Sequence, residues 1–176
     1  DAPHGHGEVL FTNVRVPASN LLGEEGKGFV YLMTELAQER FMIAIGCAAK
    51  LEAMLEETIR YTKERMVFGK PLFDFQNTRF KLAEIKTRAT AMRMMVDMYF
   101  VEHLRRKLSL EEAAIAKLYC TDELGRALDE LLQLYGGYGY MSEYPIARAY
   151  TDARVTRIYG GTNEIMKEII GKSLGV

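Results

Sequence analysis

The stretch SLEEAAIAKLYCTDELGRALDELLQLYGG, residues 109–137, carries the signals of one complete amphipathic helix. Ser109, followed three residues later by Glu112, forms a capping-box pattern that satisfies backbone N–H groups at a helix N-terminus. Apolar side chains then recur every three or four residues, at Cys120, Leu124, Ala127, Leu131 and Leu134. The pair Gly136–Gly137 ends the pattern. The stretch therefore predicts a long helix whose apolar stripe must be covered by other helices.

The same spacing predicts helices on both sides of this stretch. One helix of about 35 residues ends near Arg65. Tyr144–Pro145 opens a short helix, because proline suits the first helical turn. A final helix begins near Thr162, with Thr162 or Asn163 as its cap. The expected stripes are Phe29, Leu32, Leu36, Ile43, Cys47 and Met54 on the first helix, and Leu82, Ile85, Ala89, Met92, Val96, Tyr99 and His103 on the next. We expect an all-α fold, an antiparallel four-helix bundle.

The N-terminal segment has a different pattern. Residues Glu8 to Pro17, EVLFTNVRVP, alternate and are rich in valine and phenylalanine, which predicts one β-strand that ends at Pro17. A lone strand is not stable, so its partner strands are expected outside these residues. The glycine-rich loop GEEGKG, residues 23–28, separates this short β remnant from the helices.

Composition limits the kinds of partner. The 176 residues are 48% hydrophobic and carry a net charge of -1, which gives no electrostatic case for nucleic acid or an anionic membrane. No apolar run is long enough to predict a membrane span. Cys47 and Cys120 lack C-x-x-C spacing and are expected as buried free thiols in a reducing compartment, the cytoplasm or the mitochondrial matrix. His4 and His6 lie in a glycine-rich terminus, and no metal site is predicted from them.

Charged residues interrupt the apolar stripe in AQERFMIAIG, residues 37–46. On a helical wheel Glu39 falls beside Leu36 and Ile43, and Arg40 falls nearer the centre of the stripe. Charges at such positions cost free energy unless they are paired or used. Glu39 is therefore a candidate general base. The alternative is a structural ion pair between Glu39 and Arg40 or another partner.

Two further clusters combine glycines with polar or aromatic residues. In RMVFGKPLFDFQ, Arg65 suits a phosphate, Phe68 can stack on a ring, and Gln76 can bond a ring edge. The alternative is a plain helix–loop–helix connection with a turn at residues 69–71. QLYGGYGY and YGGTNEI offer backbone to a ligand, and the second opens a helix whose N-terminus favours anions. Glycine pairs that merely end helices are common, so neither motif is specific alone.

The order of the motifs is specific. R-x-x-F-G-x-P-L-x-x-x-Q, Q-x-x-G-G-x-G-Y, Y-P-I-A-R-A-Y-x-D-A-R and Y-G-G-T-N-E-I follow one another as they do in the C-terminal half of the acyl-CoA dehydrogenases, which this chain resembles from Glu8 onward. The resemblance implies that residues 1–22 end the family's middle β-domain and that residues 23–176 form its C-terminal helical bundle. It also implies that the chain is part of a longer enzyme.

The resemblance also implies a chemistry. Family members use FAD to oxidise an acyl-CoA to the trans-2-enoyl-CoA, and most place a catalytic glutamate where this chain has Gly160. The long-chain and isovaleryl-type enzymes place it on the first long helix, at the position of Glu39, and this chain looks most like the long-chain type. The resemblance further implies that Gly160 offers its N–H to the thioester, that Gly161 lines the substrate path, and that Arg40 lies near the CoA arm.

Cofactor contacts and assembly follow from the same resemblance. Positions that match contacts with the FAD of a neighbouring subunit are Arg65, Gln76, Gln133, Gly136 and Gly137. Thr162, Asn163 and Glu164 match contacts with the subunit's own FAD, although the carboxylate of Glu164 departs from the usual neutral side chain. A site shared between subunits implies a homo-oligomer, a dimer or tetramer. An electron-transfer flavoprotein is the expected acceptor.

Two other functions fit the same scaffold. An acyl-CoA oxidase would pass the electrons to oxygen instead of to an electron-transfer flavoprotein. A catalytically inert helical assembly module would keep the bundle and lose the chemistry. The missing glutamate at Gly160 fits the inert module, whereas the retention of Glu39 together with Arg65 and Gln133 argues against it.

Overall fold

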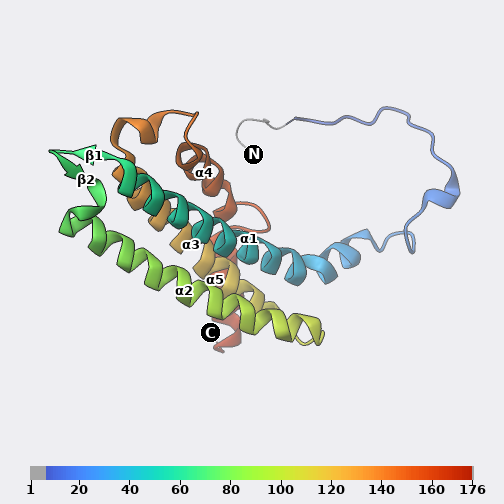
Figure 1. Cartoon of the computed structure of the whole chain (residues 1–176). Coiled ribbons are helices and arrows are strands. Elements are labelled where there is room, and N and C mark those ends of the chain that lie inside the picture. The colour runs from blue at the N-terminus through green and yellow to red at the C-terminus, as the bar shows by residue number, and fades with distance from the viewer. Residues whose placement is uncertain (1–6, 176) are drawn as a thin grey trace.

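The computed structural model describes residues 7–175 and shows a bundle of helices with one small hairpin (Figure 1). The helices are α1 (Gly28–Glu64), α2 (Gln76–Leu104), α3 (Leu110–Tyr135), α4 (Pro145–Ala153) and α5 (Asn163–Ser173). The strands β1 (Met66–Val67) and β2 (Lys70–Pro71) form the hairpin between α1 and α2. The long helices α1, α2 and α3 alternate in direction (Figure 1). The predicted all-α bundle is confirmed.

Helix α3 lies at the centre of the fold and packs against each of the other four helices. Its stripe places Leu124, Leu128 and Leu131 in the core with almost no exposure to solvent. The facing helices contribute buried Phe41, Leu51, Ile85, Met92 and Ile146. A fully buried side chain of this size stabilises the fold by about 1.5–3 kcal/mol. The core therefore fixes α3 relative to the glycine turn that precedes α5.

The predicted helix ends are found at α3, α4 and α5. The Ser109 hydroxyl accepts from the Glu112 N–H over 3.1 Å, and the Ser109 N–H donates to the Glu112 carboxylate over 2.8 Å, so the capping box is confirmed. Gly136 ends α3 with a φ of 57°, which favours glycine. Pro145 occupies the first turn of α4. Thr162 is the N-cap of α5 by position, although its side chain makes no capping bond.

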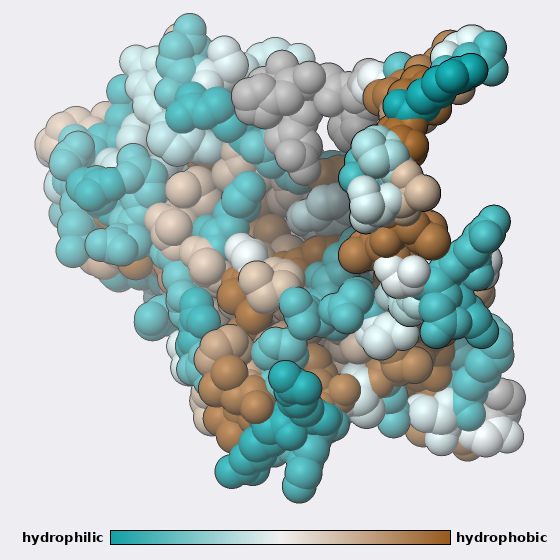
Figure 2. All heavy atoms as spheres, turned by 90° about the vertical axis from the view of Figure 1, so that its right-hand side faces the viewer, coloured by the Kyte–Doolittle hydropathy of each residue, from teal (hydrophilic) through white to brown (hydrophobic). Residues whose placement is uncertain are grey.

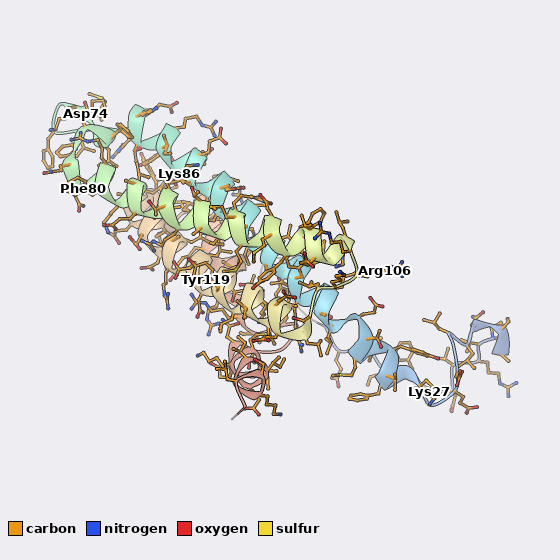
Figure 3. All side chains as sticks on the ribbon, turned by 90° about the horizontal axis from the view of Figure 1, so that it is seen from below. Lys27, Asp74, Phe80, Lys86, Arg106 and Tyr119 are labelled. Atoms are coloured by element: carbon orange, nitrogen blue, oxygen red, sulfur yellow. The ribbon has the colours of Figure 1, made fainter. Side chains whose placement is uncertain are left out.

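Burial of the two predicted stripes differs. On α2 the stripe is buried from Leu82 to Tyr99, as predicted. On α1 the prediction was wrong for the first turns, because Phe29 and Leu32 are 74% and 71% exposed. Figure 3 shows the reason: Lys27, which precedes α1, lies beyond Arg106, so these turns extend past the rest of the bundle. Figure 2 looks at this end and shows apolar surface among hydrophilic side chains.

The expected strand from Glu8 to Pro17 is not formed. Residues 7–17 are exposed and leave the bundle as an extended segment (Figure 1), because no other described segment pairs with their backbone groups. The sequence missed the hairpin, in which Met66 pairs with Pro71 and Val67 with Lys70. His4 and His6 lie outside the described residues.

Three simpler expectations concern the cysteines, metal ligands and membrane spans. Cys47 and Cys120 are free and buried, which confirms the prediction for both. Among residues 7–175, no three histidine, cysteine or acidic side chains gather as metal ligands. None of the helices in the same residues combines the length and the apolar character that crossing a membrane demands.

Candidate active site

The turn Gly160–Gly161 lies directly against α1. Both glycines have a positive φ, 64° and 92°, which a residue with a side chain adopts only at a cost. A Cβ added at Gly160 would lie 3.7 Å from Oε1 of Glu39. The position where most family members are expected to carry the base therefore adjoins the carboxylate of Glu39. The two positions that the resemblance gives as alternatives for one base are thus neighbours in the fold.

A cleft of about 420 Å³ opens beside this carboxylate. It is lined by Glu39, Met42, Ile43, Gly46, Cys47, Lys50, Leu124, Thr156 and Tyr159. Burial raises the pKa of the Cys47 thiol to about 11 and also raises the pKa of Tyr159 above its usual value. Both groups keep their protons near neutral pH. Among these nine lining residues, Glu39 alone carries a carboxylate.

Glu39 and Arg40 occupy different environments. Glu39 is exposed and, within residues 7–175, forms neither a hydrogen bond nor an ion pair. The alternative of a structural ion pair with Arg40 is therefore not found. Arg40 is only 6% exposed, and its Nε donates to the carbonyl oxygen of Gly160 over 3.1 Å. Burial lowers the pKa of Arg40, against the opposing attraction of Glu39. Its contact with a CoA arm stays a prediction.

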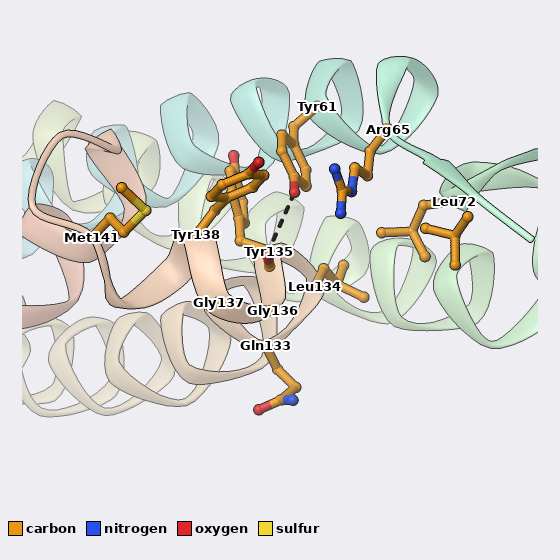
Figure 4. A pocket seen from close by; sticks show the side chains of 11 residues that line it. Tyr61, Arg65, Leu72, Gln133, Leu134, Tyr135, Gly136, Gly137, Tyr138 and Met141 are labelled. Carbon is orange, nitrogen blue, oxygen red and sulfur yellow. Dashed lines mark hydrogen bonds between the residues drawn. The ribbon is translucent and has the colours of Figure 1, made fainter.

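A second cavity, of about 500 Å³, lies at the end of α1 (Figure 4). Four predicted cofactor residues are among those that line it: Arg65, Gln133, Gly136 and Gly137. The guanidinium of Arg65 lies over the ring of Tyr138, 5.2 Å from its centroid. Figure 4 shows the side chain of Gln133 turned away from Arg65.

The remaining two predicted residues of this group do not line the cavity. Phe68 stands at the tip of the hairpin with 94% exposure, and Gln76 is exposed at the start of α2. Phe68 has a φ of 49° and Gly69 a φ of 81°, the pair of positive angles that a tight two-residue hairpin turn favours. Both cofactor contacts stay predictions.

The donor set of this cavity fits part of FAD. The guanidinium of Arg65 suits a pyrophosphate, whereas the rings of Tyr61 and Tyr138 are stacked on Tyr135 and Tyr144. A Cβ at Gly136 or Gly137 would meet no atom within 4 Å, so packing leaves the space beside both glycines open. Backbone can therefore approach a ligand closely at this point.

A third, smaller cavity of about 240 Å³ lies at the N-terminus of α5. Thr162, Asn163 and Glu164 line it together with Arg154, Arg157 and Lys167. The pKa of Glu164 lies below its ordinary value, because its own backbone N–H and the Thr162 hydroxyl bond to the carboxylate. Glu164 is not among the residues that line the cleft of Glu39.

Asn163 differs from its two neighbours in this cavity, because its side chain is buried and fully used. Its Oδ1 accepts from Lys117 Nζ over 3.0 Å. Its Nδ2 donates to Thr121 Oγ1 and to Asp122 Oδ1, each over 3.0 Å. The predicted contact between Asn163 and a cofactor stays a prediction. It would have to use the backbone of Asn163, because the side chain is already occupied.

Sequence reasoning missed Lys117. This residue lies on α3 and is wholly buried, and its Nζ donates to the carbonyl oxygen of Gly161 over 2.7 Å. The signal was available, because Lys117 precedes Cys120 by three residues on the apolar stripe. A charge on a buried stripe is the same anomaly that singled out Glu39 and Arg40.

Together these features define a class of protein: a helical-bundle domain that sets a carboxylate against a glycine turn and carries a separate cavity lined by an arginine, tyrosines and glycines. The sequence model of the acyl-CoA dehydrogenase C-terminal domain matches residues 26–175. The chain belongs to the acyl-CoA dehydrogenase family.

Several known proteins are similar to it. The mitochondrial long-chain specific acyl-CoA dehydrogenase of Sus scrofa is 49% identical over 167 residues, which cover 95% of this chain and 39% of that protein. The short-chain specific acyl-CoA dehydrogenase of Megasphaera elsdenii is 42% identical over 95% of this chain and 44% of its own length. The crystal structure of an acyl-CoA dehydrogenase from Geobacillus kaustophilus superposes with a TM-score of 0.89 at 47% identity, over 94% of this chain and 44% of that one. This chain thus spans about two fifths of such relatives.

Proposed function

We propose that this chain is the C-terminal helical part of an FAD-dependent acyl-CoA dehydrogenase of fatty-acid oxidation. The enzyme oxidises an acyl-CoA to the trans-2-enoyl-CoA, and Glu39 removes the α-proton. One observation carries the proposal: the Glu39 carboxylate lies 3.7 Å from the place where a side chain at Gly160 would begin. Two alternative positions for one base thus lie side by side.

The domain division is part of this proposal. Residues 1–22 form the end of a preceding β-domain, and residues 23–176 form the helical bundle. Support comes from the exposed side chains of Leu10 and Phe11 and from the missing strand pairing of residues 7–17. The exposed first turns of α1 offer a further apolar surface for the parts of the enzyme that precede this chain.

The chain's own groups would act as follows. The carboxylate of Glu39 accepts the α-proton of the thioester, and the N–H of Gly160 donates to the thioester oxygen, where negative charge develops. Arg40 holds the carbonyl of Gly160 and so keeps the turn beside the base. Gly161 leaves the substrate path free of a side chain. FAD, when bound, accepts the hydride that leaves the β-carbon.

Cofactor binding connects the chain to a second copy of itself. Arg65 and the segment Gln133–Gly137 would hold the FAD of a neighbouring subunit, and Thr162 to Glu164 would contact the subunit's own. A homo-oligomer, dimer or tetramer, follows from this division. The exposed side chains of Met94, Met98 and Val101 follow helical spacing along α2 and support an apolar contact between copies.

Flavin bleaching in the full-length enzyme tests the proposed function. A panel of acyl-CoAs that differ in chain length and branching is added under anaerobic conditions, and the flavin absorbance is followed. We expect bleaching by at least one straight-chain member. A dehydrogenase's reduced flavin should be reoxidised by an electron-transfer flavoprotein and should form no peroxide in air. An oxidase would instead form peroxide in air. An enzyme that binds FAD and bleaches with none of them would instead be an inert module.

A further inference from the structure

Lys117 is a buried cation, whereas most lysines lie at the protein surface. It is 0% exposed, on the face of α3 that packs into the bundle between Ala113 and Cys120. Withdrawing an ammonium group from water costs several kcal/mol unless hydrogen bonds replace the lost hydration. Burial accordingly lowers the pKa of Lys117 below that of an ordinary lysine. The fold tolerates this cost, so the partners of Lys117 indicate what it does.

Those partners belong to the glycine turn and to the start of α5. Lys117 Nζ donates to the carbonyl oxygen of Gly161 over 2.7 Å and to Oδ1 of Asn163 over 3.0 Å. Asn163 is itself anchored by Thr121 and Asp122. Within residues 7–175, Lys117 forms no ion pair with a carboxylate. Its ammonium group is therefore stabilised by hydrogen bonds to a backbone carbonyl and an amide oxygen.

A second buried cation holds the turn from α1. Arg40 Nε donates to the carbonyl oxygen of Gly160 over 3.1 Å. Two consecutive carbonyls, those of Gly160 and Gly161, are thus each bound by a buried cation from a different helix. A peptide unit is planar, so the two bound carbonyls also fix the N–H groups of Gly161 and Thr162, which belong to the same two units. The N–H of Gly160 lies one peptide unit earlier and is positioned through the backbone of the anchored turn. Two glycines in succession are otherwise the most freely rotating part of a chain.

We propose that Lys117 is a positioning residue of the active site, which acts with Arg40 to anchor the Gly160–Gly161 turn, so that the N–H of Gly160 at the start of this turn stays beside the carboxylate of Glu39. This inference rests on the proposed function. Lys117 itself touches neither the substrate nor the base. It acts through the carbonyl of Gly161, and its effect is on the geometry of the turn.

A purely structural role makes a different prediction. Leaving a buried acceptor without its donor costs about 1–3 kcal/mol of stability, whether or not Lys117 positions the turn. Lys117→Met keeps the length and removes every donor, so Gly161 and Asn163 each lose one hydrogen bond. If Lys117 served stability alone, chemistry in the folded variant would proceed at the wild-type rate. If it positions the turn, the variant folds and binds but reacts slowly.

The test uses the full-length enzyme with bound FAD. Lys117→Met is expected to slow flavin reduction by about 10- to 100-fold at saturating acyl-CoA, because a small misplacement of reacting groups has effects of this size. The dissociation constant of the acyl-CoA is expected to stay within about threefold, since Lys117 makes no ligand contact. Ile85→Ala, a deletion in the α2 core, serves as the matched destabilising control and should reduce flavin at the wild-type rate.

A second readout does not depend on turnover. In the Glu39→Gln background the acyl-CoA binds without reacting, and the infrared stretch of its ¹³C-labelled thioester carbonyl reports hydrogen bonds to the oxygen. Lys117→Met is expected to move this stretch toward its value in water. Unchanged rate and unchanged stretch would refute the positioning role and leave the proposed function standing. Absence of bleaching in the wild type would remove the proposed function itself.

Folding failure of Lys117→Met is covered by a second variant. Lys117→Gln is neutral, slightly shorter and keeps an amide donor. Positioning predicts a smaller rate loss and a smaller shift of the carbonyl stretch than complete donor removal. A folded Lys117→Gln enzyme that matches the wild type in both measurements would overturn the inference.

Discussion

Moving the proposed base from Glu39 to Gly160 is a perturbation for which the structure supplies the geometry. Glu39→Gln removes the base and keeps its size. Gly160→Glu then adds a carboxylate whose Cβ begins 3.7 Å from the old carboxylate oxygen and 2.7 Å from Cδ1 of Ile43. The second distance is too short, so the Ile43 side chain must shift. Ile43→Val removes the Cδ1 atom and should ease the introduction of the new side chain.

The magnitudes follow from these contacts. Loss of a general base lowers the rate by about 10²–10⁴-fold, or about 3–5 kcal/mol of barrier. A side chain at the positive φ of Gly160 costs about 1–2 kcal/mol, which limits the recovery. We expect Glu39→Gln/Gly160→Glu to regain about tenfold and the triple variant with Ile43→Val to regain about 10- to 100-fold, because the new carboxylate starts beside the position of the old one.

The assay is anaerobic stopped-flow reduction of the flavin in the full-length enzyme. Gly160→Gln in the same Glu39→Gln background is the matched control, since it adds the same bulk without a proton acceptor. Recovery with glutamate and none with glutamine supports two neighbouring positions for one base. A triple variant that folds, binds acyl-CoA and reacts no faster than Glu39→Gln would refute the reasoning.

Three further predictions test other parts of the molecule. Arg65→Met should weaken FAD binding by about 10- to 100-fold, the worth of a hydrogen bond to a charged group, whereas Lys63→Met in the last turn of α1 should not. Equal FAD affinities of the two variants, measured by equilibrium dialysis, would argue against the cavity. Cys120 has a pKa raised to about 12 by burial, so above pH 9 the unfolded state binds fewer protons and stability falls as pH rises. In urea unfolding from pH 9 to 11, the free energy of unfolding should fall less steeply with pH in Cys120→Ala than in the wild type, by up to about 1.4 kcal/mol per pH unit. Equal slopes in the two proteins would contradict the burial effect. Gly46→Ala should stabilise the 176-residue chain by about 0.5–1 kcal/mol in the same assay, because its Cβ meets nothing within 4 Å, and a loss of stability would contradict that open space.

Local signals predicted those parts of the fold that local interactions determine. The capping box at Ser109 and the glycine at Gly136 bracket α3 because both act within one helical turn. Periodicity failed for Phe29 and Leu32, since a stripe shows which face is apolar but not what covers it. The strand from Glu8 to Pro17 failed for the same reason, because a strand needs a partner segment.

The candidate site was predictable only in part. Periodicity left the role of Glu39 open between a base and an ion pair, and the family resemblance supplied its link to Gly160. Periodicity could have marked Lys117 as a charge on the apolar stripe, but it could not have identified the partner, because that carbonyl belongs to Gly161, 44 residues further along the chain. The short hairpin at residues 66–71 has strands of two residues, too short for any visible alternation.

The central claim is that Glu39 is the base, and its removal in the full-length enzyme tests this most directly. Glu39→Gln should still bind acyl-CoA, while anaerobic flavin reduction falls by at least about 10²-fold. Glu35→Gln, one turn earlier on α1, removes the same charge and should keep the wild-type rate. Flavin reduction at the wild-type rate in Glu39→Gln would contradict the account and would make Glu164 the next carboxylate to test.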